Sequence, residues 1–339
     1  MSLTRMKLCM IGCGEHAFSS HGPAQARYAA AHAELELAAC CDVDRTRADQ
    51  YRQRFGFARG YLDAQAMLEA ERPDAVALVV PVSRTCDMAS RILEQGFPLL
   101  LEKPPGETVA DVDRLVAAAR EGGRGGRDVP HQVAFNRRYV PLIAALRRRL
   151  DDLGPAITLQ HVRYEMVRVN RLDPDFSTTA VHAIDAVRFM ARSDFAEIRF
   201  RYQDLPELGH GVANIFMDAV MLSGTTAHLS FCPVAGVVIE RAELHARDHT
   251  FFLQIPMWNA FDAPGRLVHV ERGNVVDDRR GPSDGEGATP WEQGGFYGEY
   301  EAFLGDLAAG REPSPGLRAT RQSVEVAEAM RARRSEFRA

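Results

Sequence analysis

Near its amino terminus the chain reads Lys7-Leu-Cys-Met-Ile-Gly12-Cys-Gly14-Glu-His-Ala17, an apolar strand followed at once by a G-x-G-x-x-A turn. In this pattern Gly12 permits a tight turn, Gly14 lets a pyrophosphate approach the backbone, and Ala17 allows a helix to pack closely on the strand. The first turn of that helix offers free backbone N–H groups to phosphate oxygens. The sequence therefore predicts a dinucleotide-binding β-α-β unit, with its first helix beginning late, near Pro23.

The next apolar run, Leu35–Cys41, ends at Asp42. A carboxylate there accepts hydrogen bonds from both ribose hydroxyls of an adenosine and repels a 2′-phosphate. We therefore expect NAD rather than NADP as the cofactor. Arg45 and Arg47 follow within a few residues and could reverse this preference by binding a 2′-phosphate.

The composition is that of an ordinary globular protein long enough for two domains: 339 residues, 46% of them hydrophobic and 26% charged. The net charge of −5 and the lack of a long basic run argue against nucleic-acid binding. The sequence shows no apolar run of membrane-spanning length and no signal peptide, so we expect a cytoplasmic protein.

The six cysteines show no C-x-x-C spacing. We interpret them as small buried residues in a reducing compartment and expect no bound metal. The alternative is a metal site formed by Cys9, Cys13 and Cys40.

Strand and helix patterns alternate as far as residue 120, which predicts an α/β fold with a doubly wound parallel sheet, the Rossmann arrangement. The glycine-rich segment Glu121–Asp128 is the clearest break in the chain. We place a dinucleotide-binding Rossmann domain at residues 1–128 and a substrate-binding and oligomerisation domain at residues 129–339.

The second half has a different pattern. Several strand-like runs follow a helical pattern at 176–192, and residues 241–247 alternate between polar and apolar with period two. This alternation predicts an α/β domain built on a large, mostly antiparallel open sheet. A polar loop is expected over 277–287, and two helices, at 296–309 and 317–334, complete the chain.

A buried run, Leu99–Leu101, ends in Glu102-Lys103-Pro104-Pro105. In a parallel sheet this run delivers Lys103 to the carboxyl edge, where open α/β sheets bind their ligands. The prolines donate no backbone N–H, so the strand cannot continue. A lysine at that edge can donate a hydrogen bond or polarise a carbonyl, although the residue could also be a surface lysine in a tight turn.

A second group of polar residues lies in the helix expected at 176–192. Thr178, His182 and Asp185 share one face of that helix. His182 could act as general base on a substrate hydroxyl, with Asp185 orienting it. The alternative is a partly buried histidine that hydrogen-bonds to a neighbour.

Four motifs occur in order along the chain: Gly12-Cys-Gly14, Glu102-Lys103-Pro104, Phe135-Asn136-Arg137-Arg138 and His182-Ala-Ile-Asp185. With these motifs the chain resembles the Gfo/Idh/MocA oxidoreductases over nearly its whole length. The resemblance implies a Rossmann domain joined to an α/β domain whose open sheet forms homodimers or homotetramers. It also implies oxidation or reduction of a carbinol on a sugar, cyclitol or related polyol.

The same resemblance implies roles for individual residues. Lys103 would contact the reacting oxygen, with Glu102 and Pro104 holding its loop beside the nicotinamide, and His182 would be the acid/base. Thr178 stands where the family has an aspartate, and a threonine holds no charge near neutral pH, so Asp173 or Asp175 could substitute. The expected cofactor-binding residues are Gly12, Gly14, Glu15, His16, Ala17, Asp42, Pro81, Glu102 and Lys103, and the expected supporting residues are Glu102, Pro104, Thr178, Asp185, Asn136 and Arg137.

We therefore expect NAD(P)-dependent hydride transfer between nicotinamide and a carbinol or carbonyl of a sugar, cyclitol or polyol. Two alternatives are open: NAD-assisted cleavage of a glycoside, and a non-catalytic dinucleotide-binding regulator, which the threonine at 178 would mark. Four residues favour an anionic substrate unless they form a solvated strand edge, namely Arg163, Arg168, Asn170 and Arg171.

Overall fold

The computed structural model describes residues 6–154, 158–258 and 260–339. The chain divides into two compact units. Unit 1 comprises the chain up to Phe135 together with Phe296–Val324, and unit 2 comprises Asn136–Gly295 together with Glu325–Ala339. No helix within the described ranges is long and apolar enough to cross a membrane.

Unit 1 is built on a six-stranded parallel sheet in the order β3-β2-β1-β4-β5-β6. This is the strand order of a dinucleotide-binding sheet, with the topological switch between β1 and β4. The predicted doubly wound sheet is thus confirmed. Its strands are β1 (Met6–Ile11), β2 (Leu35–Cys41), β3 (Arg59–Tyr61), β4 (Ala75–Leu78), β5 (Leu99–Glu102) and β6 (His131–Ala134).

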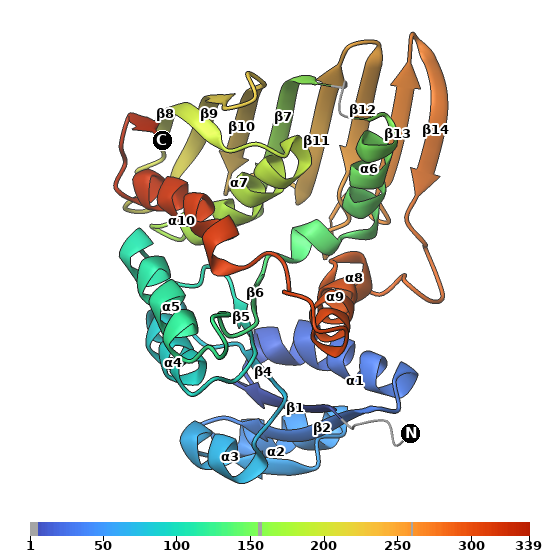
Figure 1. Cartoon of the computed structure of the whole chain (residues 1–339). Helices are drawn as coiled ribbons and strands as arrows, with labels where there is room; N and C mark the ends of the chain where they lie inside the picture. Colours follow the sequence, from blue (N-terminus) through green and yellow to red (C-terminus); the bar gives the residue numbers. More distant parts are fainter. Residues whose placement is uncertain (1–5, 155–157, 259) are drawn as a thin grey trace. The chain divides into compact units, whose positions relative to one another are not determined.

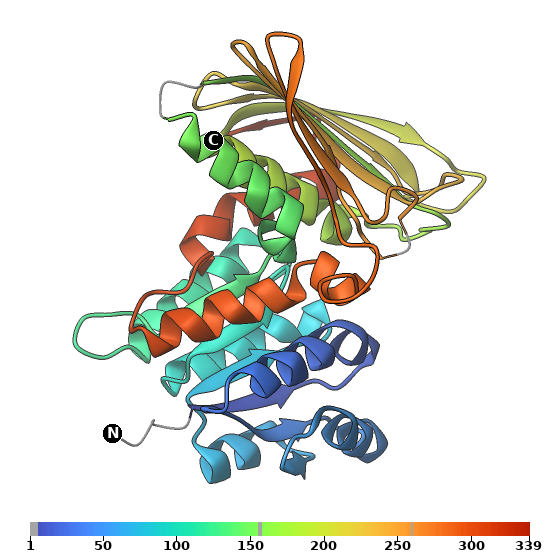
Figure 2. The same cartoon turned by 90° about the vertical axis from the view of Figure 1, so that its right-hand side faces the viewer.

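Three helices of unit 1, α2, α3 and α5, begin after a residue whose side chain accepts from their free backbone N–H groups. Asp44 accepts from the N–H groups of Thr46 and Arg47, and Thr108 forms a capping box with Asp111. Helix α9 lies beside α1, although more than 260 residues separate the two helices in the sequence (Figure 2). The helices are α1 (Gly22–Ala31), α2 (Arg45–Phe55), α3 (Ala64–Glu71), α4 (Val82–Glu94), α5 (Val109–Glu121) and α9 (Phe296–Ala308).

Helical turns precede the first helix that the sequence predicted. Helical backbone begins at Glu15, directly after the glycine turn, and Ala17–His21 form a π-helical turn before α1. There the N–H of Gly22 bonds to the carbonyl of Ala17, five residues earlier. The α-helix α1 itself begins at Gly22 with Pro23 in its first turn, so the expected start is confirmed for α1, and only the helical turns before it were not predicted.

The boundary between the units also differs from the predicted domains 1–128 and 129–339. The glycine-rich segment Glu121–Asp128 is a loop inside unit 1, because β6 follows it and pairs with β5 in the same sheet. Phe296–Val324 then return to unit 1 from the distal part of the chain. A run of glycines marks a loop, but it does not show whether the next strand leaves the sheet.

Unit 2 is built on a nine-stranded sheet in the order β14-β13-β12-β11-β7-β10-β9-β8-β15. Only the pair β7–β10 is parallel, so the predicted large, mostly antiparallel sheet is confirmed. Helices α6 (Pro141–Asp152) and α7 (Ser177–Ala191) lie against one face of it (Figure 1). Unit 2 also contains the short helix α8 (Pro290–Gln293), and the division between the units falls within α10 (Leu317–Arg331).

The nine strands are β7 (Leu159–Val167), β8 (Phe195–Asp204), β9 (Ala213–Met221), β10 (Thr226–Cys232), β11 (Ile239–Ala246), β12 (His249–Gln254), β13 (Arg266–Glu271), β14 (Asn274–Arg280) and β15 (Glu336–Arg338). The polar segment 277–287 was expected to be a loop. Its first residues, Asp277–Arg280, instead belong to β14, which pairs with β13. An edge strand exposed on both faces carries no apolar alternation, so its sequence looks like a loop.

A buried ion cluster centres on Glu240 in unit 2. Arg137 donates to both carboxylate oxygens at 3.2 Å, and Arg168 and Tyr164 donate to them as well. Arg137 is 1% exposed and Glu240 is fully buried. Burial alone would raise the pKa of Glu240, but the two guanidinium groups outweigh it and hold the pKa at about 2.

Replacing Glu240 by Gln should lower the free energy of unfolding at pH 7 by about 3–5 kcal/mol, because two buried arginines lose their counter-charge. Urea unfolding followed by tryptophan fluorescence measures this, since Trp258 and Trp291 both lie in unit 2. The depressed pKa of Glu240 stabilises the fold above about pH 4.3, the value in unfolded chains, and this contribution disappears as the pH falls towards 2. The difference between the two proteins should therefore narrow below about pH 4.

The matched control is Glu243→Gln, on the same strand but only half-buried. It should stay within about 0.5 kcal/mol of the parent protein. Equal losses from both substitutions would show that the buried charge pairing is not what stabilises unit 2.

Candidate active site

Unit 1 contains a pocket of about 820 Å³ along the carboxyl ends of its parallel strands. It spans the switch between β1 and β4, the place where open α/β sheets bind ligands. All nine residues expected to bind a cofactor line it: Gly12, Gly14, Glu15, His16, Ala17, Asp42, Pro81, Glu102 and Lys103. Their contact with a cofactor stays a prediction, but the structure brings them together.

The two glycines of the turn serve different needs. Gly12 has φ +91°, and a Cβ built on it would lie 1.9 Å from the carbonyl oxygen of Val79, so only glycine fits against that strand end. A Cβ on Gly14 would meet nothing within 4 Å. Because Gly14 also lines the pocket, the missing side chain leaves room at the backbone itself, which suits the close approach of a pyrophosphate.

Asp42 is held in place at the end of β2. Its Oδ2 accepts the N–H of Cys13 at 2.8 Å and its Oδ1 accepts the N–H of Asp44 at 2.9 Å. Each carboxylate oxygen can accept a further hydrogen bond, so the group suits a ribose diol. Arg47 lines the same pocket, whereas Arg45 is not among its lining residues.

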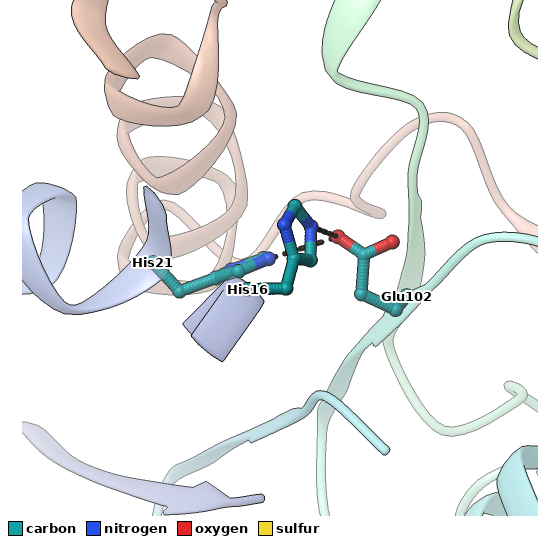
Figure 3. A group of neighbouring side chains, drawn as sticks. All are labelled: His16, His21 and Glu102. Atoms are coloured by element: carbon teal, nitrogen blue, oxygen red, sulfur yellow. Dashed lines mark hydrogen bonds and ion pairs between the residues drawn. The ribbon is translucent and has the colours of Figure 1, made fainter. Parts of the chain in front are cut away.

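Glu102 is buried at the end of β5, and its two oxygens have different partners. Figure 3 shows the side that faces His16 and His21. Oε1 lies 3.1 Å from Nε2 of His16 and 2.8 Å from Nε2 of His21, while Oε2 accepts the backbone N–H of Lys103 at 3.0 Å. Burial alone would raise the pKa of Glu102, but His16, His21 and the charge of Lys103 outweigh it and hold the pKa well below its usual value. Glu102 is therefore an anion beside the lysine.

Sequence reasoning missed the residues behind Glu102. Nδ1 of His21 lies 3.0 Å from the hydroxyl of Tyr300, which α9 supplies, and the ring of Phe296 packs edge-on against His21. Glu299, next to Tyr300, is fully buried, and neither carboxyl oxygen has a hydrogen-bond partner in the described part of the chain. Burial and the nearby charge of Glu102 raise the pKa of Glu299 well above its usual value, so this second carboxyl is neutral.

One group of side chains within the described residues has the spacing of metal ligands, namely His16, His21 and Glu102, whose ligand atoms lie within 4.8 Å of one another. Direct hydrogen bonds already join these atoms. The alternative set of Cys9, Cys13 and Cys40 consists of buried free thiols. Burial raises the pKa of Cys9 to about 12, so this thiol is not a ready metal ligand.

The second group of candidates lies on α7 in unit 2. His182 and Asp185 are buried and Thr178 is half-buried. Arg138 donates to both oxygens of Asp185 at 2.7 Å, so this carboxylate anchors an arginine from the segment before α6. Lys103 thus belongs to unit 1 and His182 to unit 2, and the surroundings of each residue are described within its own unit.

The acids that could replace the expected aspartate at position 178 have partners of their own. Asp173 accepts from Arg171 at 2.7 Å, and Asp175 accepts from the N–H of Ser177 and from Arg331. Both acids thus bind other groups of unit 2.

Two expected supporting residues, Asn136 and Arg137, bind other groups of unit 2. Asn136 donates to the carbonyl of Gly294 at 2.8 Å and accepts from Arg137, which in turn binds Glu240. Arg168, a candidate for anion recognition, is also bound to Glu240. Arg171, another of these candidates, donates to Asp173 and to the hydroxyl of Thr179.

Residues 6–125 match the family model of the Gfo/Idh/MocA proteins, described as an oxidoreductase family with an NAD-binding Rossmann fold. D-apiose dehydrogenase of Paraburkholderia graminis is 34% identical over 151 residues, which cover 44% of this chain and 38% of that protein. Inositol 2-dehydrogenase 1 of Saccharopolyspora erythraea is 31% identical over 129 residues, 37% of either chain. The chain thus matches less than two fifths of the length of these relatives.

Solved structures match over almost the whole chain, at low identity. An oxidoreductase from Agrobacterium radiobacter, in complex with NAD+, L-tartaric acid and magnesium, has a TM-score of 0.80 at 19% identity and covers 99% of this chain and 98% of that one. An oxidoreductase domain protein from Kribbella flavida has a TM-score of 0.79 at 19% identity, with 99% of both chains covered. These likenesses establish the fold. Residues 6–125 are thus similar to the NAD-binding Rossmann part of the Gfo/Idh/MocA oxidoreductase family.

Proposed function

We propose that this chain is an NAD(P)-dependent dehydrogenase, with NAD preferred, that acts on a carbinol of a sugar, cyclitol or related polyol. The observation that carries the proposal is the pocket of unit 1, where Gly14 leaves the backbone open and Asp42 presents a fixed carboxylate. The relatives named D-apiose dehydrogenase and inositol 2-dehydrogenase act, by their names, on a sugar and on a cyclitol, which favours this substrate class.

A bound nicotinamide would accept or supply the hydride. Lys103, at the edge of the pocket, donates a hydrogen bond to the reacting oxygen and stabilises the negative charge that develops there. His182 on α7 takes the hydroxyl proton or returns it, a contribution of about two to four powers of ten in rate. Thr178 cannot share the charge on His182, so the histidine performs this step without a charged partner at that position.

The basic residues of the chain support a chemical role for Lys103. Lys7 and Lys103 are the only lysines among 41 lysine and arginine residues. Arginine serves well for surface charge and ion pairs, but its guanidinium keeps its proton, whereas a lysine amine can lose one. A lysine at the carboxyl end of β5, in a chain so rich in arginine, favours a task that only an amine can perform.

One observation favours the non-catalytic alternative. Thr178 stands where the family has an aspartate, and the nearby Asp173 and Asp175 are bound to Arg171 and Arg331. A protein that only senses a dinucleotide needs neither Lys103 nor His182 for its work. Substitution of Lys103 separates the two functions.

The family resemblance also supports a homo-oligomer formed through the sheet of unit 2. Exposed apolar side chains on β12 and β14 agree with a covered sheet, among them Phe252, Val275 and Val276. Light scattering should therefore give a particle mass of two or four times the 37.6 kDa chain, and a monomer would contradict this assembly.

Gly14→Ala should leave the thermal midpoint unchanged, because the added Cβ meets no protein atom within 4 Å. The same methyl group occupies space at the pocket, so the affinity for NADH should fall about tenfold or more. Fluorescence titration with NADH and thermal unfolding without it measure the two effects separately. Gly12→Ala is the contrasting variant: its Cβ would lie 1.9 Å from Val79 O, so the thermal midpoint itself should drop. If Gly14→Ala binds NADH as tightly as the parent protein, the pyrophosphate does not bind at this turn.

The function is tested first by parallel titration with NADH and NADPH. We expect NADH to bind at least about tenfold more tightly, because Asp42 repels a 2′-phosphate, and Asp42→Ala should narrow the difference. A preference for NADPH would indicate that Arg47, rather than Asp42, determines which cofactor binds. If the protein binds neither NADH nor NADPH, the proposal is overturned.

A panel of sugars, cyclitols and polyols then identifies the compounds that the protein oxidises. Lys103→Met should abolish turnover of these compounds, while the affinity for NADH stays within about threefold of the parent value. Lys7→Met is the matched control, because Lys7 lies on β1 and its amine bonds to the carbonyl of Glu71. Turnover that survives Lys103→Met would exclude the lysine from the chemistry.

A further inference from the structure

Behind the pocket, five polar side chains of unit 1 form one continuous hydrogen-bonded chain. It runs from Glu102 to His21 (2.8 Å), Tyr300 (3.0 Å), Gln25 (2.7 Å) and Tyr51 (2.8 Å). Figure 3 shows its first link, where the His21 ring points at the Glu102 carboxylate. The four side chains that follow Glu102 are at most 1% exposed, namely His21, Gln25, Tyr51 and Tyr300. Because water does not reach them, they must hydrogen-bond to one another.

The direction of every link follows from the charge on Glu102. An ionised carboxylate only accepts, so Nε2 of His21 carries a proton. In a neutral imidazole the lone pair is then on Nδ1, which the hydroxyl of Tyr300 satisfies with its single proton. Tyr300 must therefore accept from Nε2 of Gln25, and the remaining amide oxygen of Gln25 accepts from Tyr51. One arrangement of protons satisfies the whole chain.

The surroundings keep His21 neutral in this arrangement. Burial is the largest cause that lowers the pKa of His21, and the charges of His16 and Lys103 lower it further, against the hydrogen bond and charge of Glu102. The two groups that α9 adds carry no charge either, because burial raises the pKa values of Glu299 and Tyr300 well above their usual range. A cation at His21 would also place a proton on Nδ1, so the hydroxyl of Tyr300 could no longer donate there.

Two other functions of this hydrogen-bonded series, a proton relay and a metal site, can be excluded. Tyr51 is fully buried among the rings of Phe55, Phe57 and Phe18, so the chain gives a proton no exit to solvent and is not a relay. A metal ion bound by His16, His21 and Glu102 would need the lone pair of His21 Nε2, where this arrangement places a proton. What remains is to hold Glu102 in one orientation.

We propose that His21 is a positioning residue for Lys103: fixed by Tyr300, Gln25 and Tyr51, it orients the Glu102 carboxylate, whose second oxygen holds the backbone N–H of Lys103 at the edge of the pocket. Helix α9, which supplies Tyr300, thereby helps to fix the position of the loop that carries Lys103. The importance of this arrangement for catalysis rests on the proposed function, whereas the arrangement itself can be tested without turnover.

The sparse lysines of the chain make that test direct. Protein labelled with 15N-lysine gives two lysine backbone amide signals, from Lys7 and Lys103, and Lys7→Arg assigns them. The Lys103 amide donates to Glu102 Oε2, and the Lys7 amide donates to Asp74 Oδ2 at 2.8 Å, so Lys7 is an internal reference with the same kind of bond. Hydrogen exchange of these two signals measures how firmly each loop is held.

His21→Phe should speed exchange of the Lys103 amide about tenfold or more, because Glu102 loses its buried donor and turns away. His21→Gln keeps an N–H near the position of Nε2 and should restore most of the protection, while Lys7 stays unchanged throughout. His32→Gln is the control: His32 flanks α1 at its carboxyl end as His21 does at its amino end. Equal exchange of Lys103 in the parent protein and in His21→Phe would overturn the proposal.

A second measurement holds even if His21→Phe does not fold. In 15N-histidine-labelled protein, His21 should show the Nε2–H tautomer at neutral pH, with its signals identified by their loss in His21→Gln. Tyr300→Phe removes the donor to Nδ1 and should raise the pH at which His21 protonates by about one unit, whereas Tyr61→Phe, which removes a hydroxyl bound to Glu71, should not.

An Nδ1–H tautomer, a cationic His21 at neutral pH, or tight binding of added zinc at His21 would each overturn the assignment. None of these readouts uses a substrate. A protein that oxidises no polyol but shows the expected exchange and tautomer would contradict the proposed function alone.

Discussion

The pocket of unit 1 depends on one buried anion, the carboxylate of Glu102. Burying a carboxylate costs several kcal/mol unless hydrogen bonds and charges replace its water. Here the replacements come from three places in the chain: His16 in the glycine turn, His21 before α1, and the N–H of Lys103. The same carboxylate therefore links the phosphate-binding turn to the loop that carries Lys103, and a shift of either one removes a donor from it.

The neighbourhood of Glu102 separates two carboxyl groups by environment. Glu102 has donors on both oxygens and is ionised, while Glu299 has none among the described residues and is neutral. A second anion at this depth would repel the first across a medium that screens charge poorly. The pair thus keeps a single negative charge beside Lys103, which is the sign that suits a cationic amine.

Local patterns predicted the parts of the site that a few neighbouring residues determine. The glycine turn, Asp42 at the end of β2 and Lys103 after β5 all follow from short motifs, and the structure gathers them in one pocket. The contact between His21 and Tyr300 could not be predicted, because 279 residues separate them and neither carries a motif. Likewise the face of α7 was predicted, but not that Arg138 would bind Asp185. The scarcity of lysine was readable from the sequence and points to position 103.

The discontinuity of unit 1 affects how the chain is made. All six strands of its sheet precede Phe135, but α9 begins only at Phe296. At usual rates of translation the intervening segment takes on the order of ten seconds to synthesise. During that time the imidazole of His21 and the amide of Gln25 lack the hydroxyl they share in the finished protein, and the side of α1 that α9 covers is open. The nascent Rossmann sheet therefore lacks one of its covering helices until the ribosome has synthesised α9.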